Sequence, residues 1–313
     1  MKKQEFFGNL PYPSDRKKPT LVREKDHKLF IFSPEVPEES NLVTVAVSTD
    51  QLHCGLLEMG AGSNWHFVDE HLGDEIYFIL SGNLTELECN TGECVEAYPG
   101  DMLYIPEGCK HRGYNFSENI LRLFWVIVPE IWPEETNITY PLDKIRIYKN
   151  GKDIYNLADK KESEFSLRKE LKLFKRDVNQ LGQFPLPGKE ARRNPIHYYV
   201  MNKNNCLTTV FGLKYPMRLR FFISNDYMDA GEFYLPSGGV GSRVSEVDIH
   251  DGDAVIYGLQ GPITVFFPDK PGVSYQVKEN NLMFIPEGTK YQFINYNSHP
   301  LKGYFAVAKN LDK

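Results

Sequence analysis

The sequence has no long apolar run, no excess of basic residues and few cysteines, and each absence excludes a class of protein. No apolar segment approaches the roughly 20 residues of a membrane-spanning helix, and the N-terminus "MKKQEFFGNL" lacks the apolar core of a secretory signal. The formal net charge of −6 argues against a nucleic-acid partner, which relies on a cationic surface. Five cysteines without framework spacing predict free thiols. We expect a cytoplasmic protein without a membrane or nucleic-acid partner.

Aromatic and turn-forming residues are abundant, with 20 Phe, 18 Tyr, 24 Gly and 20 Pro among 313 residues. From Leu29 onward, short apolar segments such as "EIYFIL" and "MLYIP" alternate with turn signals such as "SGN" and "PGD". Many short strands at even spacing are typical of an all-β sandwich or barrel. The length favours two domains.

One region has a different, helical pattern. Five apolar residues recur there at spacings of 4, 3, 4 and 3, which predicts one face of a helix, and Asp159 with Glu162 fits a capping box. The five are Leu167, Leu171, Phe174, Val178 and Leu181. We therefore predict an N-terminal arm (1–28), a first β domain (29–135), a short helical connector (136–205) and a second β domain (206–313).

The two β domains contain the same two sequence blocks. "HLGDEIYFILSG" (71–82) returns as "HDGDAVIYGLQG" (250–261), 179 residues later. "GDMLYIPEGCKHRGYN" (100–115) returns as "NNLMFIPEGTKYQFIN" (280–295), 180 residues later. Two ordered blocks at nearly one offset indicate a duplication with a single-residue insertion.

The first copy carries a metal-binding combination of side chains. Alternation along a strand places Glu75 and Tyr77 on one face, and a buried carboxylate without a partner is costly, so Glu75 calls for a cation. With His71 and His111 it forms a triad of two imidazoles and one carboxylate, which suits Fe(II) and, less selectively, Mn, Ni, Co or Zn. The second copy has Ala254 in place of Glu75 and Tyr291 in place of His111, so we expect a metal only in the first domain.

A fourth ligand and the substrate contacts are less tightly specified. Asp69 and His66 are alternative fourth ligands; we favour His66, because a second carboxylate would make the site more suited to Mn or Mg. The candidates for catalytic residues are Tyr77, Tyr104 and Asp69. Those for substrate binding are Trp65, Trp125 and the cation Arg122. The second domain is expected to cover the first, to form dimer surface or to hold a separate small ligand.

The two blocks of the first copy resemble the two signature motifs of the cupin superfamily. His71, Glu75 and Gly82 fit the first motif, whose first histidine position holds Asp69. The second motif is matched at every position, by Gly100, Pro106, Gly108, His111 and Asn115. The resemblance implies a bicupin of two jelly-roll barrels (double-stranded β-helices), metal ligands at His71, Glu75 and His111, and a homodimer.

The triad and the resemblance together favour an enzyme that acts on a small oxygen-rich metabolite with a carboxylate or carbonyl group. A mononuclear non-haem dioxygenase using Fe(II) comes first, because a triad leaves open positions for a chelating substrate and O₂. A Lewis-acid isomerase, decarboxylase or lyase of a sugar or keto acid is the alternative within enzymes. A non-catalytic small-ligand-binding protein is the alternative outside them.

Overall fold

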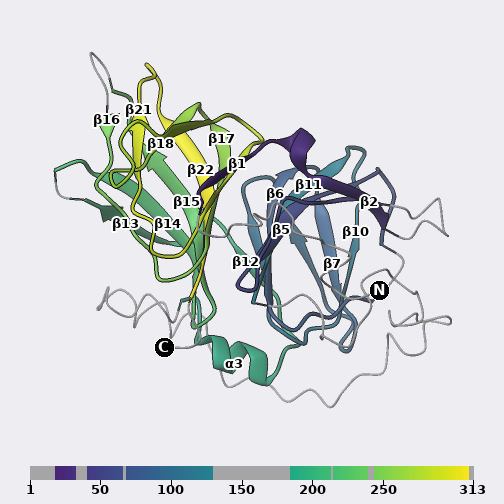
Figure 1. Cartoon of the computed structure of the whole chain (residues 1–313). Coiled ribbons are helices and arrows are strands. Elements are labelled where there is room, and N and C mark those ends of the chain that lie inside the picture. The colour runs from purple at the N-terminus through teal and green to yellow at the C-terminus, as the bar shows by residue number, and fades with distance from the viewer. Residues whose placement is uncertain are drawn as a thin grey trace.

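The computed structural model describes residues 18–32, 41–65, 68–129, 184–212, 214–238 and 243–309. Within them, strands form two bodies (Figure 1), the first half mostly in blue and the second in green and yellow, with the short helix α3 (Gly188–Arg193) below. The predicted all-β fold is confirmed. The helix predicted over 167–181, with its capping box, lies outside the described residues. No described helix has the length and apolar character needed to cross a membrane.

The first half is a barrel built from a large and a small antiparallel sheet. Between β1 (Thr20–Val22) and β2 (Lys28–Phe32) lies one 3₁₀ turn, η1 (Glu24–Asp26). The large sheet runs in the order β12 (Tyr199–Met201), β9 (Met102–Ile105), β6 (Asp74–Ser81), β11 (Leu121–Val128), β5 (His53–Met59), β3 (Asn41–Val45) and β2 (Lys28–Phe32), with β4 (Val47–Ser48) beside β5. The small sheet runs β10 (His111–Tyr114), β7 (Leu84–Glu88) and β8 (Cys94–Ala97).

The second half repeats this arrangement, as the duplicated sequence blocks require. Its large sheet runs β1 (Thr20–Val22), β20 (Leu282–Ile285), β17 (Ala254–Gln260), β22 (Leu301–Ala308), β15 (Met228–Leu235), β14 (Met217–Ser224) and β13 (Leu207–Phe211). Its small sheet runs β16 (Arg243–Val244), β21 (Gln292–Asn295), β18 (Ile263–Phe266) and β19 (Ser274–Val277).

Each half lends one strand to the other. β1, at the start of the chain, pairs with β20 of the second half, and β12, which precedes the second half, pairs with β9 of the first. In Figure 1 the purple β1 accordingly lies beside the yellow-green strands. Stretches expected from the sequence to be an arm and a connector thus contribute strands to the opposite sheets.

The central strands of each large sheet bury apolar side chains on both faces. On β6, Tyr77 and Ile79 point into the first barrel, whereas Ile76 and Phe78 join a second cluster between the halves. The Phe78 ring stacks on Tyr304 of the second half, with ring centroids 4.1 Å apart. The two large sheets therefore pack face to face, and each barrel keeps its own interior between its large and small sheets.

A buried polar network joins the halves beside β6. Asp74, fully buried, accepts hydrogen bonds from Arg192 Nη1 of α3 at 2.7 Å, from Asn225 Nδ2 of the second half at 2.7 Å and from the Glu107 amide at 3.0 Å. Burial raises the pKa of Asp74 to about 6, against the opposing effect of the Arg192 charge. Because Asp74 begins β6, the second half helps to position the residue that follows it, Glu75.

Candidate metal centre

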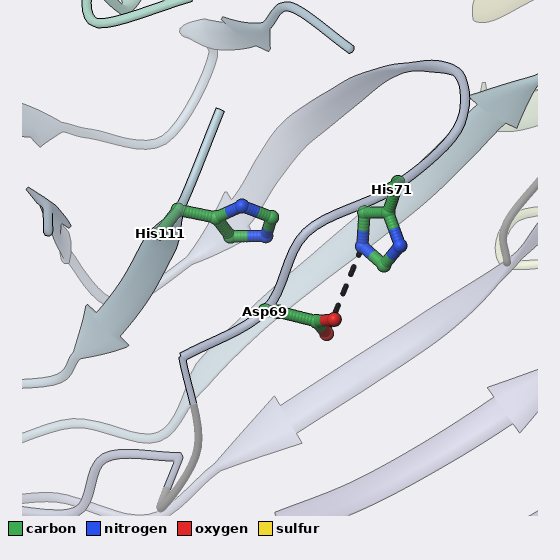
Figure 2. Close-up of side chains that lie close together, drawn as sticks. All are labelled: Asp69, His71 and His111. Atoms are coloured by element: carbon green, nitrogen blue, oxygen red, sulfur yellow. Dashed lines mark ion pairs between the residues drawn. The ribbon is translucent and has the colours of Figure 1, made fainter. Parts of the chain in front are cut away.

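Four side chains with metal-binding atoms converge at one end of the first barrel. Asp69 and His71 come from the loop before β6, Glu75 from β6 itself, and His111 from the first position of β10. Glu75 Oε2 lies 3.2 Å from Nε2 of both His71 and His111. The ligand atoms of Asp69, His71 and His111 all lie within 4.8 Å of one another. Figure 2 shows the two imidazoles and the Asp69 carboxylate facing a common space.

The Pro-x-Gly turn of the second sequence block holds the His71 loop. The Gly108 amide donates to the His71 carbonyl at 3.0 Å, and the φ of +78° at Gly108 lies in the left-handed region that favours glycine. In the second half, the Gly288 amide donates to the His250 carbonyl at 2.8 Å in the same way. The turn therefore has a structural role, which explains why the second copy keeps it although Ala254 and Tyr291 replace Glu75 and His111 there.

The motif asparagine is structural in both copies too. Asn115 Nδ2 donates to the carbonyls of Met59 at 3.1 Å and Asn119 at 2.8 Å, and Asn295 Nδ2 donates to those of Pro236 and His299. Each amide ties a strand end to a neighbouring loop. Of the second motif, only His111 supplies a ligand atom.

The charges at the centre match a cation. His111 Nδ1 donates to the Cys109 carbonyl at 2.9 Å, so in the neutral ring the Nε2 lone pair faces Glu75. Burial alone would raise the pKa of Glu75, but the adjacent imidazoles of His71 and His111 lower it to about 2. The buried Glu75 Oε2 has only the two imidazole nitrogens, each at 3.2 Å, as close polar neighbours among the contacts described above. An anionic oxygen and two ring nitrogens that converge in this way fit a divalent metal ion.

Among the described residues, Asp69 offers a fourth metal-binding side chain. Its Oδ2 lies 3.7 Å from His71 Nε2, and its backbone exchanges two hydrogen bonds with His111, of 2.8 and 3.0 Å. This bridge fixes Asp69 against β10. His66 lies outside the described residues, so its role as a ligand stays a prediction. The described donor set is two imidazoles and two carboxylates.

Three of the predicted pocket residues lie inside the same barrel. The Tyr77 hydroxyl lies 3.4 Å from His111 Nε2. The Trp65 ring packs edge-on against Tyr77 at 6.1 Å between centroids, and Trp125 is the direct cross-strand partner of Tyr77. The indole Nε1 atoms of Trp65 and Trp125 are both buried without a hydrogen-bond partner. The barrel interior therefore holds donors that no protein group uses.

Two predicted residues are not part of this centre. Tyr104 belongs to the cluster between the halves, and its hydroxyl donates to Asp74 at 3.0 Å. Arg122 lies on the opposite face of β11 from Trp125 and pairs with Glu24 at 2.5 Å and Glu58 at 3.1 Å. Both predictions of a role in the site are corrected for one reason: these side chains leave the large sheet on the face away from the barrel interior.

Glu86 is a candidate that the sequence reasoning missed. It shares a face of β7 with Leu84, which packs into the barrel core, and it is fully buried with both carboxyl oxygens unpartnered. It lies opposite Gly113 of β10, whose bare Cα the Trp65 ring covers. Burial, and then the nearby Glu75 and Asp69 carboxylates, raise the pKa of Glu86 well above its usual value. The sequence contained a signal for Glu86, because the second copy has the apolar Val265 at the equivalent position, 179 residues later.

The second half keeps Asp248 and His250 at the positions of Asp69 and His71 but replaces other polar groups of the first barrel. Among the described residues, the one cluster with metal-binding geometry is in the first half. In the second, Ala254, Ile256 and Val265 stand where Glu75, Tyr77 and Glu86 stand in the first. The two barrels thus share a backbone and differ in their interiors.

Comparison with known proteins agrees with this architecture. Residues 56–127 match the family model for the cupin domain. No curated protein sequence matches the chain. Among solved structures, AerE from Microcystis aeruginosa aligns with a TM-score of 0.55 at 10% identity, covering 93% of this chain and 99% of that one. An oxalate decarboxylase from Lactobacillus farciminis, in a formate complex, aligns with a TM-score of 0.57 at 13% identity, covering 92% and 86%.

A third solved structure, oxalate decarboxylase from Bacillus subtilis, gives a TM-score of 0.57 at 12% identity and covers 97% of this chain and 83% of that one. At these identities the alignments establish the fold, and their coverage extends over both halves. The family match falls on the half that contains Glu75 and His111. The family match therefore identifies a cupin domain in residues 56–127, and the alignments show that the whole chain shares the fold of these solved structures.

Proposed function

We propose that the first barrel is the active site of a divalent-metal-dependent enzyme that acts on a small oxygen-rich carboxylate by redox-neutral chemistry, as a decarboxylase, lyase or isomerase. The observation that carries this proposal is the convergence of Glu75 Oε2 with both imidazole Nε2 atoms at 3.2 Å. The unused hydrogen-bonding groups in the same interior support a polar substrate.

The donor set favours manganese over iron. Two imidazoles and one carboxylate suit Fe(II), whereas additional carboxylate oxygen shifts the preference toward Mn(II). Asp69 supplies that second carboxylate next to His71. The structurally similar Bacillus subtilis oxalate decarboxylase is described as having Mn(II) centres. The Fe(II) favoured by the sequence alone therefore becomes the second choice for the metal.

A bound divalent ion would supply Lewis-acid polarisation of a substrate carbonyl or carboxylate. The chain supplies the rest. Glu86, held in its protonated form by burial, keeps a proton at a carboxyl oxygen inside the barrel and can donate it. Burial, and then the Glu75 carboxylate, raise the pKa of Tyr77 well above its usual value, so its hydroxyl stays a donor beside His111.

These donors also define the substrate. The indole N–H groups of Trp65 and Trp125, the acid of Glu86 and the hydroxyl of Tyr77 offer hydrogen bonds to oxygen atoms and bring no fixed positive charge. Such a wall suits an anion whose charge the metal balances, and the surrounding aromatic rings exclude water. A buried proton donor beside such a substrate favours protonation of a carbanion or enolate over oxygen chemistry.

A dioxygenase is the second candidate, and one observation favours it. His71, Glu75 and His111 by themselves form the two-histidine, one-carboxylate arrangement of non-haem iron oxygenases. Oxygen dependence separates the candidates. Turnover under anaerobic conditions with Mn(II) supports the redox-neutral reaction, whereas Fe(II)-dependent O₂ uptake with a keto acid supports the dioxygenase.

Metal analysis with paired variants tests the centre itself. We expect about one divalent metal ion per chain in the purified protein by mass spectrometry, and its loss in His71→Gln and Glu75→Gln. His250→Gln, at the equivalent position of the second barrel, is the matched control and should retain the metal. Equal metal loss in all three variants, or a metal-free wild type after reconstitution, would contradict the proposal and leave a ligand-binding protein as the better reading.

A screen of small carboxylates then tests the chemistry. The metal-loaded protein is incubated anaerobically with oxalate, 2-keto acids and sugar acids, and CO₂ release and product formation are followed by NMR. We expect turnover of at least one class, and Glu86→Gln should lower kcat by about 10²- to 10⁴-fold, the range for loss of a general acid, while metal content is unchanged. Turnover of none of these classes, with the metal bound, would reject the redox-neutral assignment.

A further inference from the structure

The second barrel contains an apolar cavity at the place where the first barrel has its metal centre. Its volume is about 160 Å³, and five phenylalanine rings line it together with other apolar side chains. Part of this lining is formed by apolar residues at positions that lie around the metal centre in the first barrel. Ile256 stands for Tyr77, Phe293 for Gly113 and Phe305 for Trp125. The loss of the metal ligands has therefore created a different kind of interior, not a solid core.

One end of the cavity is polar and ordered. Tyr291 stands where the first barrel has His111, and its hydroxyl lies 2.8 Å from His250 Nε2 and donates to Asp248 Oδ2 at 3.3 Å. His250 Nε2 also lies 3.5 Å from Asp248 Oδ2. Burial, and then the Asp248 charge, raise the pKa of Tyr291 well above its usual value, so the phenol remains neutral. A second carboxylate, Asp229, lines the cavity as well.

We propose that the second barrel is a separate binding site for a single-ring aromatic molecule that carries a hydroxyl or amino group. The size supports one ring, since an engineered apolar cavity of about 150 Å³ lined by similar residues binds benzene. Aromatic walls favour an aromatic ring through edge and face contacts. Asp248 and the oxygen of Tyr291 offer acceptors at the polar end, which match a donor on the ligand.

The charges set the specificity. Two carboxylates, Asp248 and Asp229, line the cavity, and the Lys309 ammonium pairs with Asp229 at 2.8 Å. An anionic ring such as benzoate would be repelled by the Asp248 carboxylate, whose neighbours at this end are the Tyr291 hydroxyl and the His250 imidazole. The site therefore discriminates a phenol or benzylamine from a benzoate of the same size, in contrast to the first barrel, which we infer to bind an anion.

Calorimetric titration of the full-length protein with phenol, benzylamine and benzoate tests this site. We expect phenol and benzylamine to bind with one site per chain, and benzoate to bind at least tenfold more weakly. His71→Gln removes a ligand of the first barrel and should leave phenol binding unchanged, so contact with a metal is excluded as the source. Failure of phenol and benzylamine to bind at millimolar concentration would overturn the proposal.

Two variants fill the cavity with side chains that the first barrel already accommodates. Ile256→Tyr introduces the ring of Tyr77, and Phe305→Trp introduces the indole of Trp125. Each should abolish phenol binding while thermal unfolding remains cooperative. Tyr291→Phe keeps the ring and removes the hydroxyl, and should weaken phenol about tenfold while leaving toluene binding unchanged.

A measurement on the wild type does not depend on variant folding. Nuclear Overhauser effects from phenol protons to the Ile256 methyl groups are expected. Their absence in a sample that binds phenol, or binding that survives both filling variants, would place the ligand elsewhere and overturn the assignment.

Discussion

Replacing Glu86 with valine should make the protein more stable and inactive. The second barrel uses Val265 at this position, so a valine fits the backbone and the space. Glu86 is fully buried and neither oxygen has a partner, and burying an unpaired polar group costs about 1–3 kcal/mol in mutational data. Removing the carboxyl recovers that free energy. It also removes the proton donor of the proposed reaction.

The pH dependence gives the prediction its sign and size. The folded pKa of Glu86 lies well above its ordinary value of 4.5, chiefly because of burial, so above pH 4.5 the unfolded chain releases a proton that the folded chain retains. Stability therefore falls as pH rises, by about 1.4 kcal/mol per pH unit. Wild type should therefore lose stability relative to Glu86→Val as pH rises above 4.5, until the pH reaches the raised pKa of the folded state.

The assay is urea unfolding of the metal-free protein at several pH values, with a chelator present so that no cation alters the field at Glu86. Glu88→Val is the matched control on the same strand. Glu88 accepts hydrogen bonds from the amides of Asn90 at 3.0 Å and Thr91 at 2.5 Å, so its loss should destabilise by about 1–3 kcal/mol. A Glu86→Val protein that is less stable than wild type at pH 6.5, or a difference that does not change with pH, would refute the reasoning.

Three further predictions follow from packing and burial. Phe78→Ala should lower the free energy of unfolding by about 3–5 kcal/mol, because the fully buried ring stacks on Tyr304 across the two halves. Chemical denaturation measures this change, with a variant at an exposed position, Leu29→Ala, as the control. A cost below about 1 kcal/mol for Phe78→Ala would contradict a packed interface. Gly113→Ala should displace the Trp65 ring, which a Cβ would approach to 2.1 Å, and so shift tryptophan fluorescence and impair turnover; an unchanged spectrum is the contrary result. Burial lowers the pKa of His27 to about 4, so the neutral imidazole stabilises the fold fully above pH 6.5 and this stabilisation is lost as pH falls toward 4. His27→Gln should therefore flatten the curve of unfolding free energy against pH in this range. An unaltered curve would assign the acid sensitivity to other groups.

The alternation of side chains along a strand predicts which residues share a face. It does not predict which of two buried faces forms the barrel interior. This limit explains the two corrections. Tyr104 and Arg122 stand on strands of the large sheet, whose outer face packs on the second half, and both side chains leave on that face. Tyr77 and Trp125 leave on the inner face. Apart from the charged Arg122, the strands that carry these residues have apolar side chains on both faces, so only the packed halves distinguish the inner face from the outer one.

By itself, the sequence determined the all-β fold, the duplication and the three residues His71, Glu75 and His111, because strand periodicity and motif spacing act over short stretches of chain. Only the tertiary structure showed that the Asp69 carboxylate lies beside His71 and His111, that β1 and β12 cross to the opposite halves, and that Glu86 is buried beside the centre. These features depend on contacts between segments far apart in the chain. Their free energy comes from burial and from charges brought together by folding, which no local pattern records.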